Sequence, residues 1–159
     1  MMLFKVIFYR DFIRGVKMEN FTYAKARDFE ILVHKESGFI NYTKLCKDLT
    51  DDRKAFRNLF KYNPGFQALI LSFIQENNPG AVTPRSETIN FNVSYLVSQN
   101  VLINFNKDVK LNEMGTYGPK WMLDYIILHF KPEYYKLIHE ALETIDDVLI
   151  IYKTKLFFY

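Results

Sequence analysis

Apolar and polar positions early in the chain follow a pattern that predicts a short hairpin. The apolar segment at residues 30–34 (EILVH) is followed by a glycine-containing turn at 36–38 and by Phe39 and Ile40. Two short apolar runs around such a turn are typical of paired antiparallel strands. Upstream, the apolar residues 2–9 (MLFKVIFY) predict a strand or a short apolar arm.

Helical spacing begins directly after this hairpin. Asn41 and Thr43 are favourable N-cap residues, and the apolar positions after them predict a first helix over about residues 44–49. Residues 50–52 (TDD) interrupt the pattern and can cap a second helix that ends at about residue 62. Two short helices around a polar turn have the local layout of a helix-turn-helix.

A third helix is predicted to begin at Asn63 and Pro64. An N-cap residue followed by proline at the first helical position favours helix initiation, and residues 77–80 (NNPG) end the pattern. The inward stripe expected from its helical spacing comprises Phe66, Leu69, Ile70, Phe73 and Ile74.

The following region predicts β-structure. Polar and apolar residues alternate over residues 88–93 and again over 101–105, which predicts two strands in a hairpin or sheet extension. The segment at 95–97 between them is equally compatible with a helix.

The C-terminal third predicts two helices and a strand. Pro119 opens the first helix, which ends before Pro132 because the residue before a proline is disfavoured in the α region. The second helix is expected over about residues 132–145, and the β-branched and aromatic tail at 148–159 predicts a strand that pairs with another edge. The positions expected to face inward are Met122, Tyr125, Ile126 and His129, and then Tyr135, Ile138 and Leu142.

Composition agrees with a single α+β domain. With 159 residues, of which 49% are hydrophobic and 17% aromatic, the chain has ample material for a buried core. The single cysteine, Cys46, excludes an intramolecular disulfide and a cysteine-based zinc site, and it favours a reducing, intracellular compartment. No apolar run reaches the roughly 18 residues of a membrane span, and charges interrupt the N-terminal run, so we expect no signal peptide.

Positive charge is concentrated in the first part of the chain. The formal net charge is only +3, but residues 1–61 carry thirteen Lys/Arg and eight Asp/Glu, against eight and ten in residues 62–159. On the second predicted helix, cations at i, i+1, i+4 and i+8 share one broad face. These candidate DNA-binding residues are Arg53, Lys54, Arg57, Asn58 and Lys61, with Lys44 and Lys47 on the preceding helix.

Each of these residue types has a chemical role in nucleic-acid recognition. Arginine can form a bidentate contact with guanine and asparagine with adenine, whereas lysine neutralises phosphates. In helix-turn-helix docking the first helix crosses the backbone, so Lys44 and Lys47 are expected at phosphates. Charge alone is more typical of an ordinary solvated helix face than of a DNA-binding surface. Lys107 and Lys110 are candidates for a wing, although Asp108 and Glu113 lie beside them.

Catalytic and metal-binding patterns are weak, and we expect no enzyme activity, no cofactor and no metal. His34, His129 and His139 are scattered, and the pairing of His129 with Glu133 at i, i+4 has no second ligand pair. Cys46 falls on the apolar side of its helix and is expected to be buried.

Two segments of the chain together resemble the KilA-N domain. Residues 37–47 (SGFINYTKLCK) resemble the family's opening motif DGYINATKLCK, and residues 56–61 (FRNLFK) resemble its continuation. About seventy residues later, residues 115–117 (GTY), with PEY at 132–134, are similar to a second family motif. The resemblance spans about residues 30–138 of one domain, with residues 1–29 as an extension and 146–159 as a tail.

The resemblance implies a DNA-binding domain of phages and large eukaryotic DNA viruses, related to the fungal APSES domain, with a winged helix-turn-helix-like core. It implies double-stranded DNA as partner, no small-molecule substrate, and action in the host-cell cytoplasm (viral factory) or nucleus. In poxviruses such domains often precede a RING finger, which one cysteine does not allow, so we expect a stand-alone protein or an N-terminal fragment. The alternative is a viral protein-interaction module with a weakened DNA face, forming a homodimer through residues 148–159.

Overall fold

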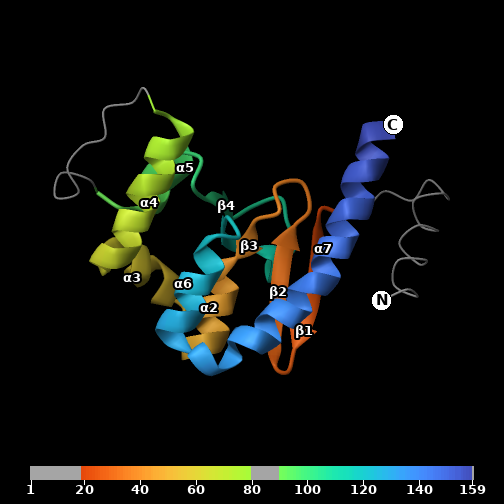
Figure 1. Cartoon of the computed structure of the whole chain (residues 1–159), viewed down its shortest axis with the longest axis horizontal. Coiled ribbons are helices and arrows are strands. Elements are labelled where there is room, and N and C mark those ends of the chain that lie inside the picture. Colours follow the sequence, from red (N-terminus) through yellow and green to blue (C-terminus); the bar gives the residue numbers. More distant parts are fainter. Residues whose placement is uncertain (1–18, 80–89, 159) are drawn as a thin grey trace.

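The chain combines helices with one antiparallel sheet in the computed structural model, which describes residues 19–79 and 90–158 (Figure 1). Within these ranges it contains six α-helices and a five-stranded sheet, which confirms the predicted α+β class. The strand or arm predicted at residues 2–9 lies outside the described residues.

The sheet has the strand order β1-β2-β3-β5-β4, with every neighbouring pair antiparallel. Its strands are β1 (Phe21–Ala26), β2 (Phe29–His34), β3 (Ile40–Asn41), β4 (Ile103–Phe105) and β5 (Gly115–Gly118). The predicted hairpin at residues 30–40 is formed by β2 and β3, where Val33 pairs with Ile40. The sheet therefore joins two distant parts of the chain, because β3 pairs directly with β5.

The α-helices gather around this sheet. They are α2 (Tyr42–Thr50), α3 (Ala55–Tyr62), α4 (Pro64–Asn77), α5 (Val93–Ser98), α6 (Met122–Phe130) and α7 (Tyr135–Phe158). Single 3-10 turns are formed by η2 (Leu111–Glu113) and η3 (Pro132–Tyr134). In Figure 1, α2 and α6 occupy the middle of the molecule, α3 and α4 lie on one side of them, and α7 runs along β1 and β2 on the other.

Asparagine side chains fix the starts of three helices. Asn41 accepts the backbone N–H of Lys44 at 3.0 Å at the start of α2, and Asn63 accepts that of Phe66 at 2.9 Å at the start of α4. Asn92 does the same for Tyr95 in α5. Such caps stabilise a helix by about 1 kcal/mol each. The predicted caps of α2 and α4 are thus confirmed at Asn41 and Asn63.

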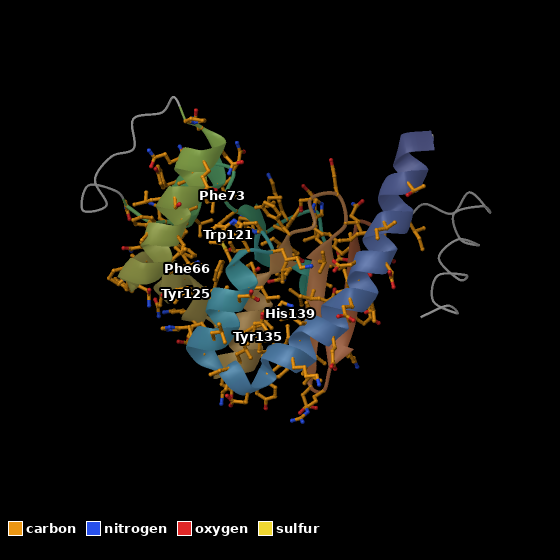
Figure 2. All side chains as sticks on the ribbon, viewed as in Figure 1. Phe66, Phe73, Trp121, Tyr125, Tyr135 and His139 are labelled. Carbon is orange, nitrogen blue, oxygen red and sulfur yellow. The ribbon has the colours of Figure 1, made fainter. Side chains whose placement is uncertain are left out.

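Aromatic rings fill the space between α4 and α6. The ring of Phe66 lies 5.1 Å from that of Tyr125, and the ring of Phe73 lies 5.2 Å from that of Trp121. Figure 2 shows these four side chains in a column between the two helices. The main core continues from this column through α2 and α3 to one face of the sheet.

The opposite face of the sheet carries a second, smaller cluster. Phe21, Leu32 and Tyr117 are its buried members, and Phe105 and Val109 pack against it. Alternation along β2 explains the division, because Ile31 and Val33 point into the main core while Leu32 points the other way.

The strand predicted over residues 88–93 is wrong over residues 90–93, which the structure describes. Residues 90–92 are not in a strand and Val93 begins α5, while residues 88 and 89 lie outside the described part of the chain. Leu96 is fully buried, so packing and the Asn92 cap favour a helix over the alternation. The second predicted strand is confirmed as β4, although it begins at Ile103 rather than at residue 101.

The tail over residues 148–158 is helical, so the strand predicted there is wrong. It continues α7 without interruption to Phe158. Residues Ile138, Leu142, Ile145 and Val148 are all buried, and they recur at helical spacing. Packing of this stripe overrides the β preference of the residues that follow it. A dimer formed by pairing the tail as a strand therefore has no strand to use.

Three positions expected to face inward are exposed. Leu69 is 42% exposed and Tyr135 is 38% exposed, while His129 is also at the surface. Each lies at the edge of the apolar stripe of its helix, where helical spacing alone does not separate a buried position from a partly exposed one. Within the described residues, no helix is both long and apolar enough to cross a membrane.

Candidate nucleic-acid interface

The turn between α2 and α3 is four residues long and is fixed by hydrogen bonds. Asp51, which adopts the left-handed conformation at φ 63°, donates its backbone N–H to the carbonyl of Lys47 at 2.7 Å and ends α2. The side chain of Asp52 then accepts the backbone N–H of Lys54 at 2.8 Å. A turn of this length between two packed helices has the layout of a helix-turn-helix.

The inner side of α3 is anchored in the main core. The ring of Phe56, which is 2% exposed, lies 5.3 Å from the ring of Tyr42 and 5.2 Å from that of Phe60. All four apolar residues predicted on this side are buried, namely Ala55, Phe56, Leu59 and Phe60. Because this side is fixed, the orientation of the outer side of α3 is fixed as well.

The outer side of α3, the turn before it and the last turn of α2 carry most of the predicted DNA-binding residues, and we call this set the α3 face. It comprises the exposed residues Lys47, Arg53, Lys54, Arg57, Asn58 and Lys61. In the part of the chain that the structure describes, none of its five cations forms an ion pair. Asp51 and Asp52 are also exposed on the same turn. Because five cations outnumber these two carboxylates, the surface is positive on balance.

The helix that carries this face begins later than predicted. It was expected from about Asp52, but α3 begins at Ala55, so Arg53 and Lys54 lie in the turn. Both side chains remain exposed beside the first turn of α3. The face thus consists of α3, the turn that leads into it and Lys47 in the last turn of α2.

Lys44 is set apart from the α3 face by an ion pair. Its Nζ lies 2.8 Å from the Oε2 of Glu30 on β2, and its side chain is 25% exposed. A partly buried and engaged ammonium is a weaker candidate for a phosphate than an exposed one. Sequence reasoning missed this pair because the two residues come from different elements.

The predicted wing residues lie on the loop between β4 and β5, residues 106–114. Lys107 and Lys110 are exposed there, and the Nζ of Lys110 lies 3.4 Å from the Oε1 of Glu19. Asp108 and Glu113 share the same loop, and Glu113 accepts the backbone N–H of Lys110 at 2.9 Å. The three nearby carboxylates offset the two ammonium groups, so the loop is not positive on balance.

The start of α2 is tied directly to this hairpin. The side-chain amide of Asn41 caps α2 through its oxygen and donates through Nδ2 to the carbonyl of Met114 at 3.1 Å. Thr43 accepts the backbone N–H of Thr116 at 2.9 Å. Gly115 adopts a φ of 147°, and a Cβ there would lie 2.6 Å from the side-chain oxygen of Asn41. Only a residue without a side chain fits this contact.

Two residues of α2, the first helix of the motif, are buried and do not contact a ligand at the surface. Tyr42 is fully buried and donates its hydroxyl to the carbonyl of Pro119 at 2.7 Å, so it packs rather than stacks on a base. Cys46 is also fully buried, as predicted, and burial raises the pKa of its thiol well above the ordinary range.

The histidines are dispersed over the structure. His34 lies 2.7 Å from the hydroxyl of Ser37, and burial lowers its pKa. His139 on α7 lies 2.7 Å from the carboxylate of Asp124 on α6, where Figure 2 shows it beside Tyr135. Among the described residues, no group of three or more His, Cys, Asp and Glu side chains is placed to hold a metal ion.

The two segments that carry the family resemblance meet in space. Asn41 pairs with Tyr117 across β3 and β5, and the contacts of Thr43 and Gly115 described above join the same two motifs. The KilA-N domain model matches residues 24–147, which is more than half of the chain. The chain belongs to the KilA-N family. No curated protein and no solved structure matches it.

The KilA-N match extends beyond the segment that resembles the family by eye. It takes in the second half of β1, which is a strand of the sheet, and the first half of α7, which packs on that strand. The KilA-N family is generally associated with DNA binding and not with catalysis. This association makes the α3 face the candidate site, in preference to any cluster of titratable groups.

One exposed side chain beside the α3 face was missed by the sequence reasoning. Tyr62, the last residue of α3, is 68% exposed, and the Nζ of Lys61 lies 5.5 Å from the centre of its ring. The available signal was its spacing: it follows Asn58 by four positions, so the two side chains adjoin on the helix surface.

Proposed function

We propose that this KilA-N domain binds double-stranded DNA by placing the α3 face against the duplex. The observation that supports this most is the set of five exposed cations without ion pairs in the described residues. Two of them lie on α3, whose other side is buried, two lie in the turn before it, and Lys47 lies on α2. Neutralising phosphates releases counterions from DNA, and this term supplies most non-specific affinity.

Different members of the face have different proposed roles. Lys47 lies in the last turn of α2, the first helix of the motif, and meets a phosphate, because that helix crosses the backbone. Arg57 and Asn58 lie on α3 itself, where a guanidinium and an amide can contact guanine and adenine edges. Arg53, Lys54 and Lys61 add phosphate contacts.

A salt series tests the proposal. If the four cations assigned to phosphates each neutralise one, the logarithm of the binding constant for a short duplex falls against the logarithm of salt concentration with a slope of about −3.6. A flat response, or no binding at low salt, would refute the proposal. A variant with both Lys25 and Lys136 changed to alanine, at exposed positions on β1 and α7, keeps the slope and serves as control.

Substitution of Arg57 separates base contacts from phosphate contacts. Arg57→Ala is expected to cost about 1–3 kcal/mol of discrimination between the preferred and other sequences, if the guanidinium contacts a base. The measurement is a competition between duplexes selected from a random pool. Uniform weakening across all sequences would assign Arg57 to a phosphate instead.

The biological setting is proposed on the resemblance of residues 37–47 to viral family members. We place the protein in replication or gene regulation of a large DNA virus, in the host cytoplasm or nucleus. Imaging of a tagged chain in infected cells tests this by its overlap with viral DNA.

The alternative is a protein-interaction module that forms a homodimer. The helical tail removes the strand pairing on which that alternative depended. Light scattering of the chain, with and without residues 148–159, still tests it: a tail-dependent dimer that ignores DNA would favour it over DNA binding.

A further inference from the structure

The groove beside the α3 face, between α3 and α6, has the features of a binding site for a planar ring. Its volume is about 470 Å³, within the range of about 300–1,000 Å³ that is typical of small-molecule sites. Asn58 belongs both to the α3 face and to the lining of this groove, so a nucleic acid on the α3 face lies at its mouth.

Each wall of the groove carries an exposed ring. Tyr62 stands on the α3 wall and is 68% exposed, and His129 stands on the α6 wall at the surface. Leu59 and Phe130 add apolar lining between them. Bases stack on aromatic side chains, which is sequence-tolerant because every base has a π-face.

The α6 wall is held in place by a chain of contacts. The ring of His129 is stacked on that of Tyr125 at 6.0 Å with an interplanar angle of 12°. The hydroxyl of Tyr125 donates to the side-chain oxygen of Asn63 at 2.7 Å, and Asn63 caps α4. The wall is thus fixed to the start of the next helix rather than to a loop.

Charge and hydrogen-bonding groups are arranged for a nucleotide. Lys61 places its ammonium over the Tyr62 ring, where the phosphate of a stacked nucleotide can reach it. The exposed amide of Asn58 offers the donor and acceptor that match the edge of adenine. Asp52 is the one carboxylate in the lining, and its side chain is engaged by the backbone N–H of Lys54.

We infer that the groove between α3 and α6 takes one unpaired nucleobase of a DNA strand, stacked on Tyr62 and contacted by Asn58. This inference rests on the proposed function, because the strand reaches the groove from the α3 face. The domain would then prefer DNA with an unpaired base, since a base already out of the stack costs less to insert than a paired one.

Binding of three DNA probes to the full chain tests the inference. The probes are a short matched duplex, the same duplex with one unpaired 2-aminopurine, and the corresponding single strand. Stacking of one base is expected to strengthen binding of the second probe about tenfold over the first, and to quench the 2-aminopurine fluorescence.

Variants connect this preference to the groove. Tyr62→Ala removes the tenfold preference and the quenching, whereas Tyr62→Phe retains both because the ring remains. Asn58→Ala weakens the preference for unpaired adenine over unpaired thymine. Tyr23→Ala, at an exposed tyrosine on β1 that is 56% accessible, leaves all values unchanged.

The outcomes separate this inference from the proposed function. Equal affinity for the matched and unpaired probes, or a preference that survives Tyr62→Ala, overturns the base site while leaving duplex binding intact. Failure of every probe at low salt overturns the proposed function as well. Displacement of the unpaired probe by micromolar adenosine monophosphate would assign the groove to a free nucleotide and also overturn the inference.

Discussion

The α3 face and the loop between β4 and β5 both carry the exposed cations that the sequence nominated, yet their surroundings differ. On the α3 face the five cations have no ion-pair partner among the described residues, whereas on the loop Lys110 lies 3.4 Å from Glu19. Asp108 and Glu113 lower the potential of the loop further. A basic residue is therefore a DNA candidate only when its neighbours leave its charge uncompensated.

The two regions also differ in how they are supported. The inner side of α3 is buried in the main core through Phe56 and its aromatic neighbours. The loop packs on the small cluster only through the half-buried Val109, and the hydroxyl of Tyr117 donates to the Glu113 carbonyl at 2.7 Å. We expect substitutions to separate these two regions in three ways.

The largest expected effect is on stability. Phe56→Ala removes a ring that is 2% exposed and packs among three other rings, so it should lower the free energy of unfolding by about 3–5 kcal/mol. Leu111→Ala, in the loop at 84% exposure, should change it by less than about 0.5 kcal/mol. Urea unfolding measures both, and a loss below about 1 kcal/mol for Phe56→Ala would contradict the account of the core.

The second effect concerns DNA affinity. Changing Arg57 and Lys61 together to alanine should weaken duplex binding by about 1–3 kcal/mol and reduce the magnitude of the salt slope by about one, because only Lys61 of the two is assigned to a phosphate. Changing Lys107 and Lys110 together should do much less, because nearby carboxylates already offset them. Equal losses in the two double variants would remove the distinction between the regions.

The smallest expected effect is the change of stability with pH that arises at the small cluster, on which the loop between β4 and β5 packs. Burial lowers the pKa of His34, which packs against Phe21 and Phe105 of the small cluster, and Glu36 opposes the shift only partly. The unfolded chain therefore binds more protons as the pH falls through about 6.5, and stability present above that pH is progressively lost below it.

His34→Gln tests this assignment. The variant should show a weaker loss of stability than the native chain between about pH 7 and pH 5.5, measured by urea unfolding at each pH. Amide exchange should report faster opening of β4 and β5 than of α3 on acidification of the native chain. An unchanged pH dependence would place the titrating group elsewhere.

Sequence patterns predicted the parts of the fold that are determined locally. The starts of α2 and α4 follow from Asn41 and Asn63, and the apolar side of α3 follows from its spacing. By contrast, β1 (FTYAKA) was not predicted because alanine and lysine have weak strand preference. It is stabilised by pairing with β2 and by packing of α7, which local sequence does not reveal.

In the candidate site too, some features follow from local sequence and others depend on tertiary packing. Exposure of Arg57, Asn58 and Lys61 follows from the helical spacing that also buries Phe56. The engagement of Lys44 by Glu30 and the groove beside Tyr62 depend on which elements become neighbours. Those neighbours are set by tertiary packing, so only the structure distinguishes a free cation from a paired one.

The double use of the Asn41 amide has a consequence for which sequences can encode this domain. Aspartate would keep the cap of α2 but would lose the donor to Met114, and serine would be too short to reach it. A side chain at Gly115 would displace the same amide. We therefore expect positions 41 and 115 to vary together, because a change at either disrupts the same contact unless the other changes as well.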